Sequence, residues 1–144
     1  MSKYEYWLHG SCVHVEYPDR LKHIRCAGYY TEVHQKGGTS NWFNFGIPTP
    51  TIHNGKPMKH SRVHLLAEVL ENAKLDKVHI WDGDRCVQKI DKLGLKHQHV
   101  DREFDVPPQK VRHGLMISVY VEFLDGEEEG EVHFIGAGAT FEQA

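Results

Sequence analysis

The sequence has few cysteines, no long apolar run and no large excess of charge of either sign. Its three cysteines, Cys12, Cys26 and Cys86, form no Cys-x-x-Cys pair, so neither a disulfide framework nor a thiolate zinc site is expected. No stretch approaches the roughly 20 apolar residues that cross a membrane. The first residues do not resemble a signal peptide, so we expect a cytoplasmic protein. The net charge of −3 argues against nucleic acid as a partner.

Histidine is the residue in excess, with 12 among 144 residues. Because free imidazole titrates at about pH 6.5, the charge of this histidine-rich chain should change steeply just below neutrality. Two interpretations stay open. Most of these histidines are solvated residues on strand faces, or a subset of them converges on a metal ion or a substrate.

The clearest strand pattern covers residues 114–124, where β-branched and aromatic residues alternate with a period of two. Met116, Ser118 and Tyr120 lie on one face of this strand, and Leu115, Ile117 and Val119 lie on the other. An acidic turn at residues 125–130 follows, and residues 131–141 are predicted to pair with the first strand as a hairpin. Within the second strand, Gly136 and Gly138 indicate a bulge or a close backbone approach.

Similar patterns predict further short strands at residues 4–9, 11–17, 24–35, 42–47, 77–81, 85–90 and 100–106. Asp82-Gly83 is a strong hairpin signal, and Pro107-Pro108 is expected to end the last of these strands. Residues 61–73 fit both a strand and a helix. The strand is preferred because short alternating segments surround it, whereas a helix would make the fold α+β.

About ten short strands separated by turn residues predict an all-β fold. The expected architecture is an antiparallel two-sheet sandwich or jelly roll, in one domain that covers residues 1–144. The longest irregular stretch is predicted at residues 48–60, which contain three prolines. Such a stretch is either an ordered crossover between the sheets or a functional loop. Its histidines, His53 and His60, are candidate ligand-binding residues.

The strand before this stretch carries an aromatic and polar cluster. Trp42 and Asn44 share one face, and Phe43 and Phe45 share the other. If the phenylalanines are inside, Trp42 and Asn44 are free to stack on and hydrogen-bond a small-molecule ligand such as a sugar. In the alternative interpretation, Trp42 packs against the neighbouring sheet. Trp81, before the Asp82-Gly83 turn, is a further candidate with the same alternative.

The pattern most suggestive of a metal is His97-Gln98-His99 followed by Glu103. Residues two apart on a strand point to the same face, so two imidazoles at this spacing suit one ion, and a carboxylate extends the shell. The pattern His-x-His-x-x-x-Glu resembles the first motif of the cupins. That resemblance implies His97, His99 and Glu103 as ligands, with His133 from a later strand, for a divalent transition metal such as zinc, nickel or iron.

The chain departs from the cupin pattern at two positions. Asp91 stands where the motif has glycine, and Ala137 stands where the second motif has asparagine. In the alternative interpretation, the histidines lie on a polar, solvated strand edge.

Several segments in order along most of the chain resemble a family of uncharacterised, small bacterial β-sandwich proteins. They are Trp7-Leu8-His9-Gly10, Trp42-Phe43-Asn44-Phe45-Gly46-Ile47-Pro48-Thr49-Pro50, Val78-His79-Ile80-Trp81-Asp82-Gly83, Gly114-Leu115-Met116-Ile117-Ser118-Val119 and Phe134-Ile135-Gly136-Ala137-Gly138-Ala139. The resemblance implies an all-β sandwich with a strand at residues 61–73. It implies no activity.

Three functional hypotheses follow, and none of them assigns a catalytic residue. The preferred one is a non-enzymatic ligand-binding or assembly module that self-associates, because a sandwich has sheet edges to pair or protect. The second is a metal-dependent enzyme or metal-binding protein that uses the histidine and glutamate residues named above. The third is a cofactor-free isomerase or cyclase with a barrel cavity, in which histidine and aspartate transfer protons.

Overall fold

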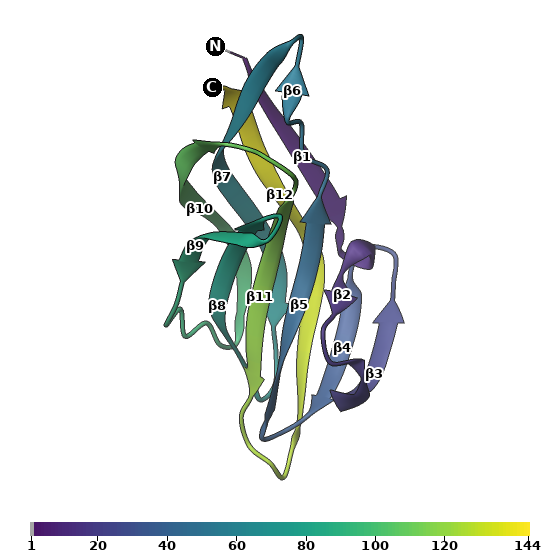
Figure 1. Cartoon of the computed structure of the whole chain (residues 1–144). Coiled ribbons are helices and arrows are strands. Elements are labelled where there is room, and N and C mark those ends of the chain that lie inside the picture. Colours follow the sequence, from purple (N-terminus) through teal and green to yellow (C-terminus); the bar gives the residue numbers. More distant parts are fainter. Residues whose placement is uncertain (1) are drawn as a thin grey trace.

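The computed structural model describes residues 2–144, which form two antiparallel β-sheets packed face to face (Figure 1). Two 3-10 helices, η1 (Gly10–Cys12) and η2 (Pro18–Arg20), flank a short strand near the start. The strands are β1 (Lys3–His9), β2 (His14–Val15), β3 (Leu21–Cys26), β4 (Thr31–Lys36), β5 (Thr39–Ile47), β6 (Ile52–His53), β7 (Lys56–Val69), β8 (Ala73–Asp82), β9 (Arg85–Ile90), β10 (Gln98–Lys110), β11 (Leu115–Phe123) and β12 (Glu129–Gln143).

The larger sheet, sheet A, has the strand order β10-β7-β12-β4-β3, with β1 paired to β12 and β6 paired to β7. Sheet B has the order β2-β5-β11-β8-β9. Strand β12 pairs with β7 on one side, and on its other side it pairs first with β4 and then with β1. The expected all-β sandwich is therefore confirmed, with twelve strands in the described part of the chain instead of about ten.

Period-two alternation decides which side chains fill the space between the sheets. On β5, Phe43 and Phe45 are fully buried, while Trp42 and Asn44 lie on the outer face. Phe134 of β12 packs against Phe43 from the other sheet, with 4.8 Å between ring centroids. Burial of one such side chain contributes about 1.5–3 kcal/mol. The inward phenylalanines therefore fix the outward orientation of Trp42.

The stretch predicted to be irregular, residues 48–60, is largely a strand hairpin. Strands β6 and β7 meet at Asn54-Gly55, where φ is 51° and 72°. This pair favours a tight hairpin turn because both residues tolerate a left-handed backbone. The crossover interpretation holds only for the residues before β6, which carry the chain from sheet B to sheet A.

Two further strand predictions are corrected. Residues 24–35 are not one strand, because β3 ends at Cys26 and β4 starts at Thr31. Strand β10 does not end at Pro107-Pro108 but continues to Lys110 after a shift of register against β7. An edge strand accepts proline because its outer N–H groups need no partner, and β10 is an edge of sheet A.

The predicted hairpin between residues 114–124 and 131–141 is wrong. Strand β11 pairs with β5 and β8 in sheet B, and β12 lies in sheet A. The acidic turn at residues 125–130 therefore carries the chain from one sheet to the other. Alternation shows that each segment is a strand, but it does not show which strand is its partner.

Two further predictions are confirmed, namely the strand in residues 61–73 and the role of the glycines in residues 131–141. Residues 61–69 continue strand β7, so the helix alternative is excluded. A register shift lies between Phe134 and Gly136, and a Cβ built on Gly138 would lie 2.8 Å from a Trp7 ring carbon. The glycines thus mark a bulge and a close approach by β1.

Among residues 2–144, no helix is long and apolar enough to cross a membrane.

Candidate functional site

The outer face of sheet B carries an aromatic cluster, called here the aromatic face and defined by Trp42, His79, Trp81 and Tyr120. Tyr120 on the central strand β11 lies opposite Trp42 on β5. The Trp42 ring lies 4.9 Å from the Tyr120 ring and 4.9 Å from the His79 ring, centroid to centroid. The ring of Trp42 reaches His79, two strands away, over Ser118, which is short and pairs with His79. The small residue on the middle strand thus lets the larger rings meet.

A surface hollow of about 450 Å³ lies beside these rings. Its lining combines aromatic rings, a thioether and two carboxylates from Glu16, Trp42, His79, Trp81, Gly83, Asp84, Met116 and Ser118. This volume is within the range of small-molecule sites, which are mainly apolar with a few polar groups that orient the ligand. The hollow suits a ligand with one apolar face and a polar rim.

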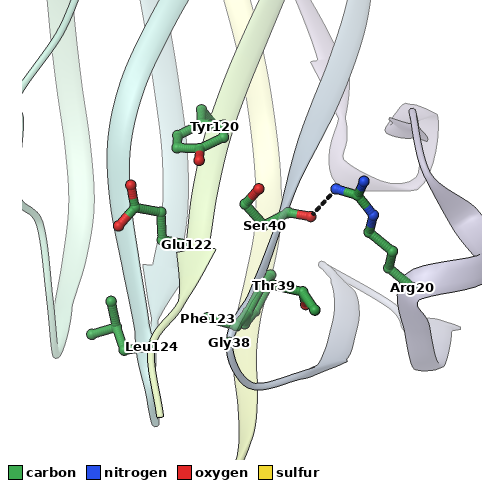
Figure 2. A pocket seen from close by; sticks show the side chains of 8 residues that line it. All are labelled: Arg20, Gly38, Thr39, Ser40, Tyr120, Glu122, Phe123 and Leu124. Atoms are coloured by element: carbon green, nitrogen blue, oxygen red, sulfur yellow. Dashed lines mark hydrogen bonds between the residues drawn. The ribbon is translucent and has the colours of Figure 1, made fainter. Parts of the chain in front are cut away.

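A second hollow, of about 540 Å³, lies farther along the same face, and Figure 2 shows the side chains that line it. Arg20 Nη1 donates a hydrogen bond of 2.9 Å to the Ser40 carbonyl oxygen, and Glu122 adds a carboxylate. Tyr120 lines this hollow and contacts Trp42, which lines the first. The two rings therefore stand between an aromatic hollow and a polar one.

Two polar groups on the aromatic face need explanation. His79 Nε2 lies 2.9 Å from Asp91 Oδ1, and this hydrogen bond holds the pKa of the Asp91 carboxyl below its usual range. The carboxylate therefore fixes the orientation of the His79 ring. The Asn44 Oδ1 atom is covered and has no hydrogen-bond donor among the described residues. A covered, unpaired acceptor costs free energy, so this atom destabilises the folded state.

Sequence reasoning placed Trp42, Asn44 and Trp81 among the ligand-binding candidates, and all three lie on the outer face of sheet B. It did not single out His79 or Tyr120. The alternation along residues 114–124 placed Tyr120 with Ser118, but only the register shows that both lie beside Trp42. The sequence pattern therefore indicates which residues share the outer face, but it does not indicate that Tyr120 contacts Trp42.

The two histidine candidates of the 48–60 segment lie elsewhere. The His53 ring packs on Tyr4 of β1, with 4.4 Å between centroids. His60 lies between the sheets with none of its surface exposed, and neither ring nitrogen has a hydrogen-bond partner. The prediction that His60 binds a ligand is corrected, because the inward face of β7 hides it. Apolar side chains of both sheets form the core between them in the described residues.

The predicted metal ligands are not brought together. His97 precedes β10 with a φ of 46°, which breaks the alternation that would have put it beside His99. His99 instead lies 3.0 Å from Glu68. Glu103 is four residues farther along the strand, or about 13 Å at 3.3 Å per residue. His133 lies on β12, where it contacts Glu131 at 2.6 Å. The cupin-like ligand set is therefore corrected.

Glu103 takes part in another arrangement. His64 Nε2 lies 2.9 Å from Thr140 Oγ1, and His64 Nδ1 lies 3.4 Å from Glu103. This is the order of a nucleophile, a base and an orienting acid. Thr140, however, is paired on both sides, with Glu5 and with Arg62. Backbone amides in such ladders are engaged, so they offer no pair of free donors for an oxyanion. The arrangement is best described as a polar network that runs from buried His64 and Thr140 to the exposed Glu103.

The sequence matches a family of unknown function, DUF6623, over residues 1–143, and the chain belongs to this family. No curated protein matches the sequence.

Solved structures resemble its fold at low sequence identity. A xylan-binding module, CBM86, from Roseburia intestinalis has a TM-score of 0.55 and 14% identity over 98% of this chain and 96% of that one. A CBM4 structure has a TM-score of 0.53 and 12% identity over 85% of this chain and 82% of that one. A family two carbohydrate esterase from Cellvibrio japonicus has a TM-score of 0.53 and 11% identity, and the chain covers 35% of its length. The fold thus resembles that of carbohydrate-binding modules.

Proposed function

We propose that the chain is a glycan-binding module that holds a polysaccharide against the aromatic face. The observation that carries this proposal is the cluster of Trp42, Tyr120 and Trp81, whose rings are half-buried on the outside of a sheet whose inner face is packed. Aromatic surface beside polar groups is typical of ligand sites rather than of a bare sheet face.

The chemistry of a sugar ring matches this surface. The C–H faces of a pyranose are apolar and its edges carry hydroxyl groups. Stacking on an aromatic ring removes both apolar surfaces from water. Around the rings, the carboxylates of Glu16 and Asp84 accept hydrogen bonds from hydroxyl donors.

A chain of sugars fits better than a single one. The aromatic hollow and the polar hollow lie on the two sides of the Trp42–Tyr120 pair, so a ligand that crosses both rings occupies both hollows. The likeness of the fold to a xylan-binding module supports a neutral polysaccharide as the first ligand to test.

The experiment is affinity electrophoresis of the protein in gels that contain xylan, mannan, β-glucan or galactan. We expect retardation by at least one of them and its loss in Trp42→Ala. The matched control is Trp7→Ala, since Trp7 is 45% exposed on β1 of the other sheet. If no polysaccharide retards the wild-type protein, or if both variants lose binding equally, the proposal is wrong.

Self-association remains a prediction, and the outer edge of sheet A is the surface we propose for it. Strand β3 is an edge strand with Ile24 46% exposed. An exposed edge strand offers unpaired backbone groups to a second copy of the chain. Light scattering coupled to size exclusion should give a dimer mass for the wild type and a monomer mass for Ile24→Lys. A wild-type monomer would contradict this prediction.

A further inference from the structure

The same tripeptide, Glu-Val-His, occurs on two strands of sheet A. It covers residues 32–34 on β4 and residues 131–133 on β12. In both copies the valine is fully buried in the core. Because neighbouring residues on a strand face opposite sides, the glutamate and the histidine of each copy lie together on the outer face.

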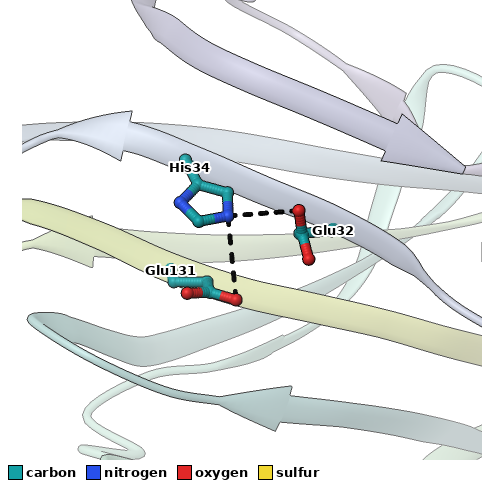
Figure 3. A group of neighbouring side chains, drawn as sticks. All are labelled: Glu32, His34 and Glu131. Carbon is teal, nitrogen blue, oxygen red and sulfur yellow. Dashed lines mark ion pairs between the residues drawn. The ribbon is translucent and has the colours of Figure 1, made fainter.

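The register brings the two copies into direct opposition. His34 pairs with Glu131, and Glu32 pairs with His133. Antiparallel pairing thus places a histidine opposite a glutamate twice, and the four side chains form a square. His34 Nε2 lies 3.3 Å from Glu32 and 3.7 Å from Glu131, as Figure 3 shows. His133 Nε2 lies 2.6 Å from Glu131 and 3.7 Å from Glu32.

These separations suit a small cation. Zinc binds imidazole nitrogen and carboxylate oxygen at about 2.0–2.2 Å in a tetrahedron, which places neighbouring ligand atoms about 3.3–3.6 Å apart. One ligand atom each from Glu32, His34 and Glu131 lies within 4.8 Å of the others. His133 Nε2 borders this group of three, at 2.6 Å from the Glu131 oxygen and 3.7 Å from the second carboxylate oxygen of Glu32. Small side-chain movements would therefore bring all four atoms around one metal ion.

The surroundings prepare the group for this role. Carboxylates such as Glu32 and Glu131 are ionised at neutral pH, which is the form that binds metal. Glu129 lies 3.6 Å from the other nitrogen of His34, Nδ1. A carboxylate in that position orients metal-bound histidines in many proteins.

One more contact orients the fourth side chain. The Tyr30 ring stacks on the His133 ring, with 4.5 Å between centroids and 19° between planes. The side chains of the square are between 16% and 24% exposed, so an ion would bind at a half-buried site that solvent can enter.

We propose that Glu32, His34, Glu131 and His133 bind one divalent transition-metal ion, for which Zn²⁺ is the first ion to test. The two imidazole nitrogens favour zinc over calcium or magnesium, which prefer oxygen ligands, and zinc also accepts carboxylates. The ion would join β4 to β12, so it would strengthen sheet A. This site lies on the opposite sheet from the aromatic face and does not depend on glycan binding.

The test is calorimetric titration of tag-free, full-length protein with ZnCl₂, with CaCl₂ as the comparison ion. We expect one Zn²⁺ per chain, weaker calcium binding, and a rise of the thermal midpoint with Zn²⁺. Removing an outer contact of a metal site weakens binding about 10–100-fold. His34→Asn and Glu131→Gln, which remove ligands, should lose at least that much.

The matched control is His99→Asn, because His99 and Glu68 also form a histidine–carboxylate contact on sheet A. This variant should bind Zn²⁺ like the wild type. Cobalt absorption of the wild type gives an independent result, since a tetrahedral site gives intense visible bands and a hydrated ion does not. No zinc binding by the wild type, or an equal loss in His99→Asn and His34→Asn, would show an ion-pair network only and would overturn the proposal.

Discussion

The two outer faces of this sandwich are built by the same alternation and carry different chemistry. On sheet B, the Trp42 ring contacts Tyr120 on the neighbouring strand and crosses the short Ser118 to reach His79. On sheet A, histidines and glutamates of β4 and β12 stand opposite one another. Alternation decides only that these side chains are outside. The register then decides whether their neighbours across the strands make a stacking surface or a ligand set.

The difference predicts how each face responds to change. The aromatic face depends on shape, since rings of fixed size enclose a hollow beside a small residue. The square of Glu32, His34, Glu131 and His133 depends on charge and on four atoms at short distances. A substitution that fills space should therefore harm the first face, and one that removes a charge should harm the second.

The largest expected effect is a crossed loss of the two ligands. Trp42→Ala should weaken polysaccharide binding about 100-fold, equivalent to about 2.7 kcal/mol, and leave Zn²⁺ affinity unchanged. Glu131→Gln should do the reverse. The sites lie on opposite sheets and share no partner, so their effects should add. Titrating both ligands into the two variants and the double variant measures this. A loss of both ligands in either single variant would contradict the separation of the faces.

A substitution between the sheets should change stability and leave both faces alone. His60 is fully buried and unpaired, and burial lowers its pKa below the usual value. An unsatisfied buried group costs about 1–3 kcal/mol, so His60→Leu should raise the free energy of unfolding by about that amount. Urea denaturation measures it. His53→Leu, in the half-exposed contact with Tyr4, is the control and should change stability little.

The same residue predicts a pH dependence with a definite sign. Because the folded-state pKa of His60 is lowered, the unfolded chain takes up the proton first as the pH falls. Wild-type stability should therefore decrease below about pH 6.5, the unfolded value, until the folded pKa is reached. His60→Leu should be flatter over that window. An equally steep decrease in the variant would assign it to other groups.

The sequence predicted orientation better than proximity. The alternation of Trp42, Phe43, Asn44 and Phe45 predicted that one pair is inside and the other outside, and the structure buries the phenylalanines. It did not predict that β11 and β12 lie in different sheets, since a hairpin and a connection between sheets have the same alternation. For the same reason the sequence alone does not indicate that the two Glu-Val-His segments lie side by side. Only the register places His34 opposite Glu131.

The metal prediction shows the complementary error. The spacing of His97 and His99 suits one metal ion only if both residues are on a strand. His97 has a positive φ and lies outside β10, so the two side chains do not share a face. Among the four predicted ligands, only His133 belongs to the square, because its neighbours are supplied by β4 and not by β10.

A smaller effect should come from filling space on the aromatic face. Gly46 pairs with Met116, which lines the hollow, and a Cβ on Gly46 would meet no atom within 4 Å. Gly46→Val should therefore keep or slightly raise stability, since valine favours strands. It should weaken polysaccharide binding about tenfold, or about 1.4 kcal/mol, by narrowing the approach to Met116. Unchanged binding would place the ligand farther from β5. Zn²⁺ affinity, measured in parallel, should not change.

The smallest expected effect concerns the His79–Asp91 contact. Asp91→Asn keeps the size of the side chain but replaces the charged acceptor that orients the His79 ring. Exposed pairs of this kind contribute little, so polysaccharide affinity should fall by no more than roughly threefold. Because the pKa of Asp91 is lowered in the folded state, the wild type loses this contribution to stability as the pH falls below about 3.9. The stability of the Asp91→Asn variant should lack this decrease below about pH 3.9. If its affinity instead fell as far as that of Trp42→Ala, His79 would be a direct ligand contact, and the aromatic face would depend on charge as the square does.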